Sequence, residues 1–103
     1  MAKISMFVKL TAKAGSRDDL LKVFVDSLPL VEQEEGTEVY SFHADAADEN
    51  VMWVHEIYTD QAALDAHFTG PALAQVFGSA GDYLDGAPEM ITCAVVDGKG
   101  VSA

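Results

Sequence analysis

Apolar and polar positions alternate along residues 3–12, at the start of the chain. The apolar side of the alternation holds Ile4, Met6, Val8 and Leu10. A period of two places successive side chains on opposite faces of a strand. These residues are therefore predicted to form a strand that is buried on one face.

A helical period follows the turn at Gly15. Ser16 is placed to cap a helix, and Asp19 stands at the position of a capping-box acid. Apolar residues then recur at helical spacing, at Leu20, Leu21, Phe24, Val25, Leu28 and Val31. Pro29 falls within this stripe, where it removes a backbone hydrogen bond and is expected to kink or split the helix. Gly36 ends the helical stretch.

Two strands come next, at residues 37–44 and 51–58, with the polar turn DAADEN between them. Thr59 or Asp60 is expected to cap a short helix, and the TGP at 69–71 interrupts it.

The last part of the chain is predicted to hold a helix, a strand and a tail. Residues 71–84 resume the helical character, with Pro71 tolerated in the first turn. Residues 89–97 are predicted to form a fourth strand. The tail, residues 98–103, has no core signal of its own.

This order of elements predicts an α+β fold. It is the ferredoxin-like βαββαβ arrangement with a four-stranded antiparallel sheet, in a single domain over residues 1–103. The helices would cover one sheet face and leave the other to water. However, the third and fourth strands are apolar on both sides, and the chain has no spare helix to cover a second face. The simplest cover is another copy, so a homodimer is expected.

The charge balance limits the partners. Six Lys and Arg stand against seventeen Asp and Glu, for a net charge of −11. Such a surface repels phosphate groups, so nucleic acid and anionic membrane are not expected as partners. The acidic VEQEEG and DAADEN stretches are predicted to be solvated surface.

The expected location is cytoplasmic. No run approaches eighteen apolar residues, and the N-terminal residues lack a cleavage site. Cys93 is alone, which excludes a disulfide within the chain and fits a reducing compartment.

Glu56 and His67 are the candidate chemical groups. His67 shares the apolar face of its helix with Leu64 and Phe68, and that helix folds back over the strand that holds Glu56. We expect the two to form a buried, hydrogen-bonded pair. Glu56 would orient the imidazole, and the other ring nitrogen would take a phenol proton. Alternatively, the pair only fixes the helix on the sheet.

Other polar groups are weaker candidates. Tyr58 could donate a hydrogen bond to a substrate carbonyl or form a pocket wall. His43 and His55 stand at no metal-ligand spacing with His67, so no metal is expected.

Three segments resemble the antibiotic biosynthesis monooxygenase family of dimeric α+β barrels. They are KAGSRDDLLKVF, EQEEGTEVYSF and, above all, VHEIYTDQAALDAHFTGPALAQ. The family is functionally mixed. It includes cofactor-independent oxygenases of polycyclic phenols and quinols, haem-degrading enzymes and an isomerase of quorum-signal breakdown.

The resemblance implies which side chains meet a ligand. Family ligands lie between the sheet and the helices, while the opposite sheet face packs on the partner subunit. Trp53, His55 and Phe7 would then face the partner. The catalytic residues implied are Glu56, His67 and Tyr58. Residues implied to bind substrate are Met6, Val8, Leu10, Met52, Val54, Phe68 and Phe77.

The sequence also departs from the family's better-known sites. Val54, Tyr58 and Leu64 stand where the polyketide oxygenases have Asn, Trp and Tyr. Val8 and Phe77 stand where the haem-degrading branch has Asn and its His ligand, which disfavours haem. No basic residue on the ligand side could hold the phosphate of an isomerase substrate.

The hypothesis is therefore a monooxygenase that needs no haem, flavin or metal and acts on a quinol or an aromatic, polyketide-like small molecule. The alternatives are an isomerase of the signal-degrading kind, or a non-catalytic dimeric barrel that binds a hydrophobic small molecule or assists a pathway partner.

Overall fold

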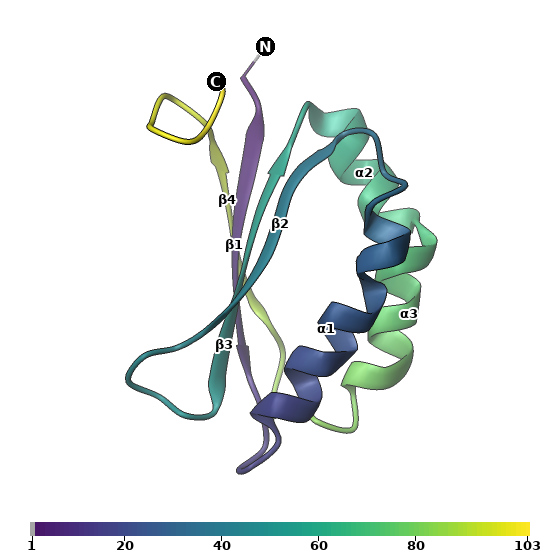
Figure 1. Cartoon of the computed structure of the whole chain (residues 1–103), viewed down its shortest axis with the longest axis vertical. Helices are drawn as coiled ribbons and strands as arrows, with labels where there is room; N and C mark the ends of the chain where they lie inside the picture. The colour runs from purple at the N-terminus through teal and green to yellow at the C-terminus, as the bar shows by residue number, and fades with distance from the viewer. Residues whose placement is uncertain (1) are drawn as a thin grey trace.

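The order of strands and helices predicted from the sequence is the order in the structure, a computed structural model that describes residues 2–103 (Figure 1). The second helical region is divided in two, as the TGP predicted. The elements are β1 Ile4–Thr11, α1 Arg17–Val31, β2 Thr37–Ala44, β3 Val51–Tyr58, α2 Gln61–Thr69, α3 Pro71–Ala80 and β4 Glu89–Ala94.

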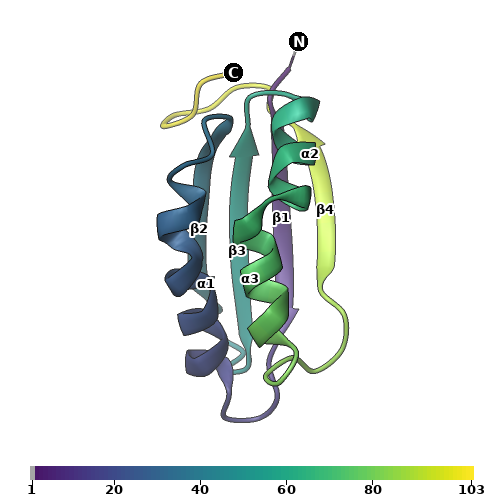
Figure 2. The ribbon, with the colours of Figure 1, turned by 90° about the vertical axis from the view of Figure 1, so that its right-hand side faces the viewer.

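The four strands form one antiparallel sheet in the order β2-β3-β1-β4. Helix α1 and the α2–α3 pair lie side by side on the same face of the sheet, and β4 is at an edge (Figure 2). The predicted α+β, ferredoxin-like fold is therefore confirmed.

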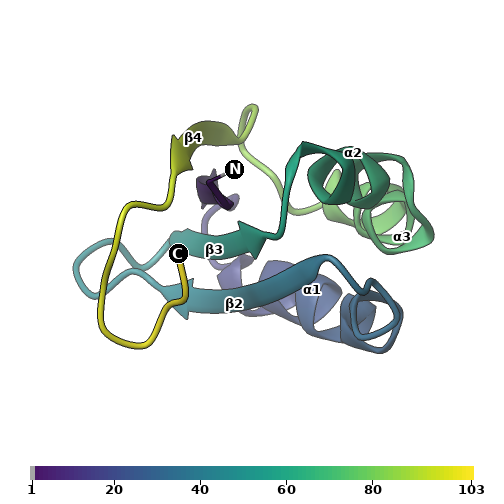
Figure 3. The same ribbon diagram turned by 90° about the horizontal axis from the view of Figure 1, so that it is seen from above.

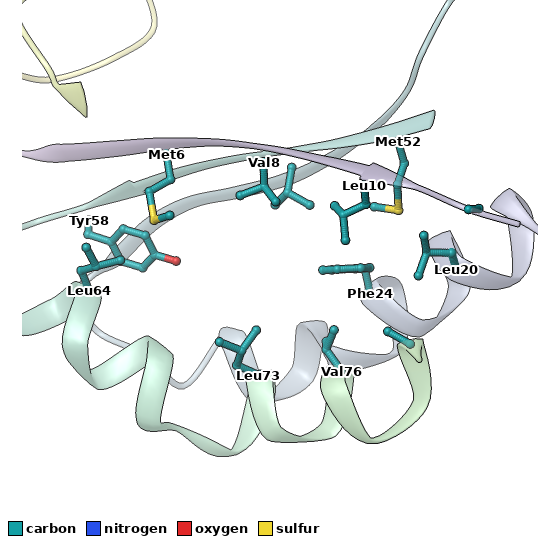
Figure 4. Packing of buried hydrophobic residues seen from close by; sticks show 13 residues of the cluster. Met6, Val8, Leu10, Leu20, Phe24, Met52, Tyr58, Leu64, Leu73 and Val76 are labelled. Carbon is teal, nitrogen blue, oxygen red and sulfur yellow. The ribbon is translucent and has the colours of Figure 1, made fainter. Parts of the chain in front are cut away.

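The core lies between the sheet and the helices. In β1 and β3 every second side chain points toward the helices, as the period of two predicts (Figure 4). Leu20 and Phe24 of α1 and Leu73 and Val76 of α3 pack against them. The sheet side chains of this core are Met6, Val8, Leu10, Met52, Val54 and Tyr58.

Pro29 does not split the first helix, which continues to Val31. The proline lies in the last turn, where a missing N–H costs a single hydrogen bond to the preceding turn. The backbone N–H of Glu32 still donates to Leu28, at 2.9 Å. The predicted splitting was wrong because so little helix follows the proline.

The two predicted helix caps differ in the structure. Ser16 occupies the N-cap position of α1, but its side chain makes no capping hydrogen bond. Asp60 caps α2, where its carboxylate accepts a hydrogen bond from the backbone N–H of Ala63 at 2.9 Å. Of the two residues predicted to cap this helix, Thr59 and Asp60, it is Asp60 that does so.

The last helix and strand are shorter than predicted. Helix α3 ends at Ala80 rather than at residue 84. Leu84 instead forms an isolated β-bridge with Ala12. Strand β4 ends at Ala94 rather than at residue 97. The tail that follows crosses the side of the sheet away from the helices (Figure 3), and its Val101 is half-buried there near Ile57.

The sheet face opposite the helices is termed the outer face. Phe7 of β1 pairs with Ile91 of β4 there, and these side chains are 43% and 61% exposed. Phe7 also stacks on His55, with ring centroids 5.0 Å apart. The outer face therefore presents apolar and aromatic side chains to its surroundings.

Trp53 is only partly exposed on the outer face. Its indole N–H donates a 2.8 Å hydrogen bond to Asp45, and Lys9 lies 6.0 Å from its ring. Asp45 also accepts hydrogen bonds from the backbone of Ala47 and Asp48. Asp45 therefore organises the turn between β2 and β3 while remaining at the surface, as predicted for DAADEN.

Within residues 2–103, none of the helices combines the length and the apolar character needed to cross a bilayer.

Candidate active site

A cavity of about 110 Å³ lies between the sheet and the helices. Its sheet wall is formed largely by apolar side chains of β1 and β3, and its helix wall by Phe24, Leu73 and Val76. Of the residues expected to bind substrate, those that line it are Met6, Val8, Leu10, Val54, Phe68 and Phe77. Met52 does not line it, because its side chain is fully buried in the core beside Leu10 and Leu20 (Figure 4).

Three of the cavity's apolar side chains are largely exposed. Phe68 of α2, Phe77 of α3 and Met90 of β4 are 42%, 61% and 55% exposed. Because they are both exposed and in the lining, they mark where the cavity reaches solvent.

His67 is the buried polar group of the helix wall, with 2% of its side chain exposed. Its Nδ1 lies 2.8 Å from Oε1 of Glu34, and its Nε2 lies 3.9 Å from Oε1 of Glu56. The second distance exceeds a hydrogen bond. The predicted hydrogen bond between Glu56 and His67 was therefore wrong, although both side chains are buried and adjacent.

Glu56 instead accepts a short hydrogen bond from the hydroxyl of Tyr58, two residues along the same strand face. This neighbour competes successfully because side chains at i and i+2 of a strand point the same way. Burial raises the pKa of Glu56, while the Tyr58 hydrogen bond and His67 act to lower it. Burial, followed by the nearby charge of Glu56, raises the pKa of Tyr58, so its hydroxyl keeps the proton that it donates.

Tyr58, expected to be catalytic, is fully buried and does not line the cavity. It meets the site through its hydrogen bond to Glu56 and through its ring, whose centroid lies 5.4 Å from that of His67. Figure 4 shows its hydroxyl pointing into the layer between the sheet and the helices.

Glu34 is the site residue that the sequence did not reveal. It lies in the loop between α1 and β2, within the stretch predicted to be solvated surface, yet its side chain is only 16% exposed. Its Oε1 accepts hydrogen bonds from Thr37 and His67, at 2.7 and 2.8 Å. Nothing in EQEEG distinguishes Glu34 from its acidic neighbours, because only the path of the loop turns it inward.

Tyr40 of β2 was also missed, and it lines the cavity with its ring centroid 5.1 Å from that of His67. Burial raises the pKa of its hydroxyl. Tyr40 and Phe42 pair with Glu56 and Val54, so strand alternation was a signal that could have found them.

The site thus joins an apolar cavity to one imidazole and two carboxylates. Of the residues that the structure describes, no Lys or Arg lines it, which suits a neutral substrate better than an anionic one. Among residues 2–103, no three His, Cys, Asp or Glu side chains gather in a way that could hold a metal ion.

The chain is similar to known proteins in its sequence pattern and in its fold. The family model described as antibiotic biosynthesis monooxygenase matches residues 4–78. None of the curated proteins is similar enough to this sequence to count as a relative.

The solved structures include close matches in fold. A Nitrosomonas europaea protein of unknown function shares 25% identity at a TM-score of 0.86, covering 100% of this chain and 98% of its own. A candidate antibiotic biosynthesis monooxygenase from Caulobacter crescentus shares 25% identity at a TM-score of 0.87, with 93% and 92% covered. A conserved Bacteroides thetaiotaomicron protein, at 16% identity and a TM-score of 0.81, covers 91% and 98% and supports the fold alone.

Proposed function

This chain belongs to the antibiotic biosynthesis monooxygenase family, and from that premise we propose that it oxygenates a small quinol or phenol-like aromatic molecule in the cavity between its sheet and helices. The observation that carries the proposal is the buried imidazole of His67. Its Nε2 makes no hydrogen bond within the described residues, and the ring lines an otherwise largely apolar cavity.

The proposed first step is a proton transfer. Nε2 of His67 removes the proton of a substrate hydroxyl, and the apolar lining excludes the water that would otherwise solvate the base. The resulting anion is electron-rich enough to react with molecular oxygen as the second substrate. In the net reaction, the ring carbon opposite the hydroxyl takes one oxygen atom of O₂ and becomes a carbonyl, and the hydroxyl carbon becomes the second carbonyl of a quinone. The hydroxyl hydrogen and the ring hydrogen leave with the second oxygen atom as water, and the substrate supplies the electrons.

The size of the cavity limits the substrate. Ligand pockets of drug-sized molecules usually span about 300–1,000 Å³, well above the 110 Å³ of this cavity. A single or fused ring that enters as Phe68 and Phe77 move apart fits this space better than a large polycycle.

A non-catalytic role is the second candidate, and the same small volume favours it. In that role the barrel would bind a hydrophobic small molecule or assist a pathway partner. The isomerase hypothesis has less support, because no basic side chain within residues 2–103 lines the cavity to hold a phosphate.

We also propose that the protein works as a homodimer joined through its outer faces. The exposed pair Phe7 and Ile91 and the stacked His55 support this arrangement, since the helices cover only the opposite face.

Oxygen uptake against a panel of quinols and anthrones tests the oxygenase proposal. We expect His67→Ala to lower kcat by roughly 100-fold or more, the usual contribution of a general base. His43→Ala is the matched control, because His43 is exposed on β2 and does not line the cavity. An inactive wild-type protein with every substrate, or equal turnover by His67→Ala, would refute the proposal.

A further inference from the structure

The two nitrogens of His67 have different surroundings. A carboxylate has only acceptor oxygens, so the 2.8 Å contact with Glu34 requires Nδ1 to donate. In a neutral imidazole the single proton then resides on Nδ1, and Nε2 keeps its lone pair. The nearest carboxylate oxygen to Nε2 belongs to Glu56 at 3.9 Å, and it already accepts from Tyr58.

We propose that Glu34 is the positioning residue of this site. It holds His67 in the Nδ1–H tautomer, so that Nε2 serves as the base, and it stabilises the imidazolium formed when Nε2 takes the substrate's proton. This inference rests on the proposed function and assigns to Glu34 the orienting role that the sequence had suggested for Glu56.

Glu34 is held firmly enough for this role. The hydroxyl of Thr37 donates to the same Oε1 at 2.7 Å, which ties the carboxylate to the start of β2. The backbone N–H of Glu34 donates to Val31 at 2.9 Å, which ties its loop to the end of α1. The carboxylate is therefore anchored to the sheet and to α1 while it contacts His67 on α2.

The other oxygen of Glu34 adds a second observation. Oε2 is buried and has no hydrogen-bond partner among residues 2–103. A buried acceptor without a partner is unfavourable to the fold. With no other hydrogen bond on Oε2, more of the negative charge of Glu34 is available to stabilise the imidazolium beside it.

Glu34 lies outside the cavity, so replacing it should affect His67 without affecting substrate binding directly. Glu34 does not line the cavity and contacts the reaction only through His67. On its other side it lines a surface depression with Glu32 and Glu38. Removing Glu34 should therefore change the state of the imidazole without changing the shape of the cavity.

Nitrogen-15 NMR of the His67 ring tests the tautomer directly. In the wild-type protein, at a pH where the ring is neutral, we expect a protonated Nδ1 signal well separated from an unprotonated Nε2 signal. In Glu34→Leu the two signals should move toward each other as the tautomers exchange. Glu32→Leu, which removes an exposed carboxylate from the same depression, should leave them in place.

Turnover supplies the second readout. Glu34→Gln keeps the size of the side chain and loses its charge, so we expect kcat to fall roughly 10-fold or more while KM and the melting temperature stay unchanged. A wild-type ring protonated on Nε2, or signals unmoved by Glu34→Leu, would overturn the role of Glu34 whatever the turnover. Absence of oxygen uptake by the wild-type protein would instead count against the proposed function.

Discussion

At the scale of single residues, the geometry of the site depends on which side chains form hydrogen bonds with its two carboxylates. Glu56 lies on the helix side of β3 and is satisfied by Tyr58, its neighbour on the same strand face. Nδ1 of His67 is satisfied by Glu34, which is distant in sequence. The two carboxylates therefore have different hydrogen-bond partners, although both lie within 4 Å of the same ring.

The raised pKa of Glu56 predicts a pH-dependent stability. The folded protein holds a proton on Glu56 at pH values where the unfolded chain, with a pKa of 4.5, has released it. The free energy of unfolding therefore falls as pH rises from 4.5 through the folded-state pKa. A glutamine at position 56 can still accept a hydrogen bond from Tyr58 but cannot ionise. Glu56→Gln should therefore remove this decrease in the free energy of unfolding.

We expect Glu56→Gln to match the wild-type stability near pH 4 and to exceed it at higher pH. The gain should be about 1.4 kcal/mol for each pH unit that separates the folded from the unfolded pKa. Urea unfolding across this range measures it, with the exposed Glu35→Gln as control. A stability difference that does not change with pH would contradict the prediction.

At the scale of elements, the loop between α1 and β2 touches helix α2 at Gly36. A Cβ placed on Gly36 would stand 2.3 Å from Cβ of Ala63. The backbone carbonyl of Gly36 also accepts from Thr59 at 2.9 Å. This close approach keeps the loop that holds Glu34 against the helix that holds His67.

Gly36→Ala should therefore destabilise the protein by about 1–3 kcal/mol, the usual cost of overpacking. It should also disturb the contact between Glu34 and His67. Gly78→Ala is the matched control, because a Cβ there meets no atom within 4 Å and alanine favours the interior of α3. Thermal unfolding of the two variants measures this difference in stability. Equal melting temperatures would count against the close contact between Gly36 and Ala63.

The turn between β2 and β3 depends on Asp45. Hydrogen bonds from the backbone of Asp48, from the indole of Trp53 and from the backbone of Ala47 lower the pKa of Asp45 to about 2. Its contribution to stability is thus present above its unfolded pKa of 3.8 and is lost as pH falls through about 2.

Trp53 is the sole tryptophan, so its fluorescence reports on this turn. We expect an acid transition with a midpoint near pH 2 in the wild-type protein. Asp45→Ala should show altered emission already at neutral pH and no such transition. A wild-type midpoint close to 3.8 would mean that these hydrogen bonds do not hold in solution.

At the scale of the whole molecule, one layer of helices covers one face of the sheet (Figures 1 and 2). The tail crosses the outer face without covering Phe7 and Ile91. An exposed apolar pair in the sheet is therefore the feature that association would bury.

Replacing Ile91 with Asp places a charge in the proposed interface. Light scattering should give the wild-type protein a mass of twice 11.0 kDa and Ile91→Asp a mass near 11.0 kDa. Val25→Asp is the control, since Val25 is 49% exposed on α1, away from the outer face. A wild-type monomer at micromolar concentration would disprove the dimer.

The sequence by itself determined the order of elements and which sheet faces are apolar. Alternation in β1 and β3 directed Met6, Val8 and Val54 toward the helices, and the bounds of β3 agree with the predicted residues 51–58. Such patterns are local, since each depends on the period of two or 3.6 and on capping residues near in sequence. For the same reason His67 was correctly placed on a buried helix face.

Only the tertiary structure decided which polar groups meet. Glu34 and His67 are far apart in sequence, and their hydrogen bond depends on the path of a loop that carries no periodic signal. Glu56 and His67 lie side by side as expected, but the expected hydrogen bond between them does not form. A hydrogen bond requires contact within about 3 Å, a precision that strand and helix periods do not supply. The fold follows from repeated local preferences, whereas the site follows from a few long-range contacts.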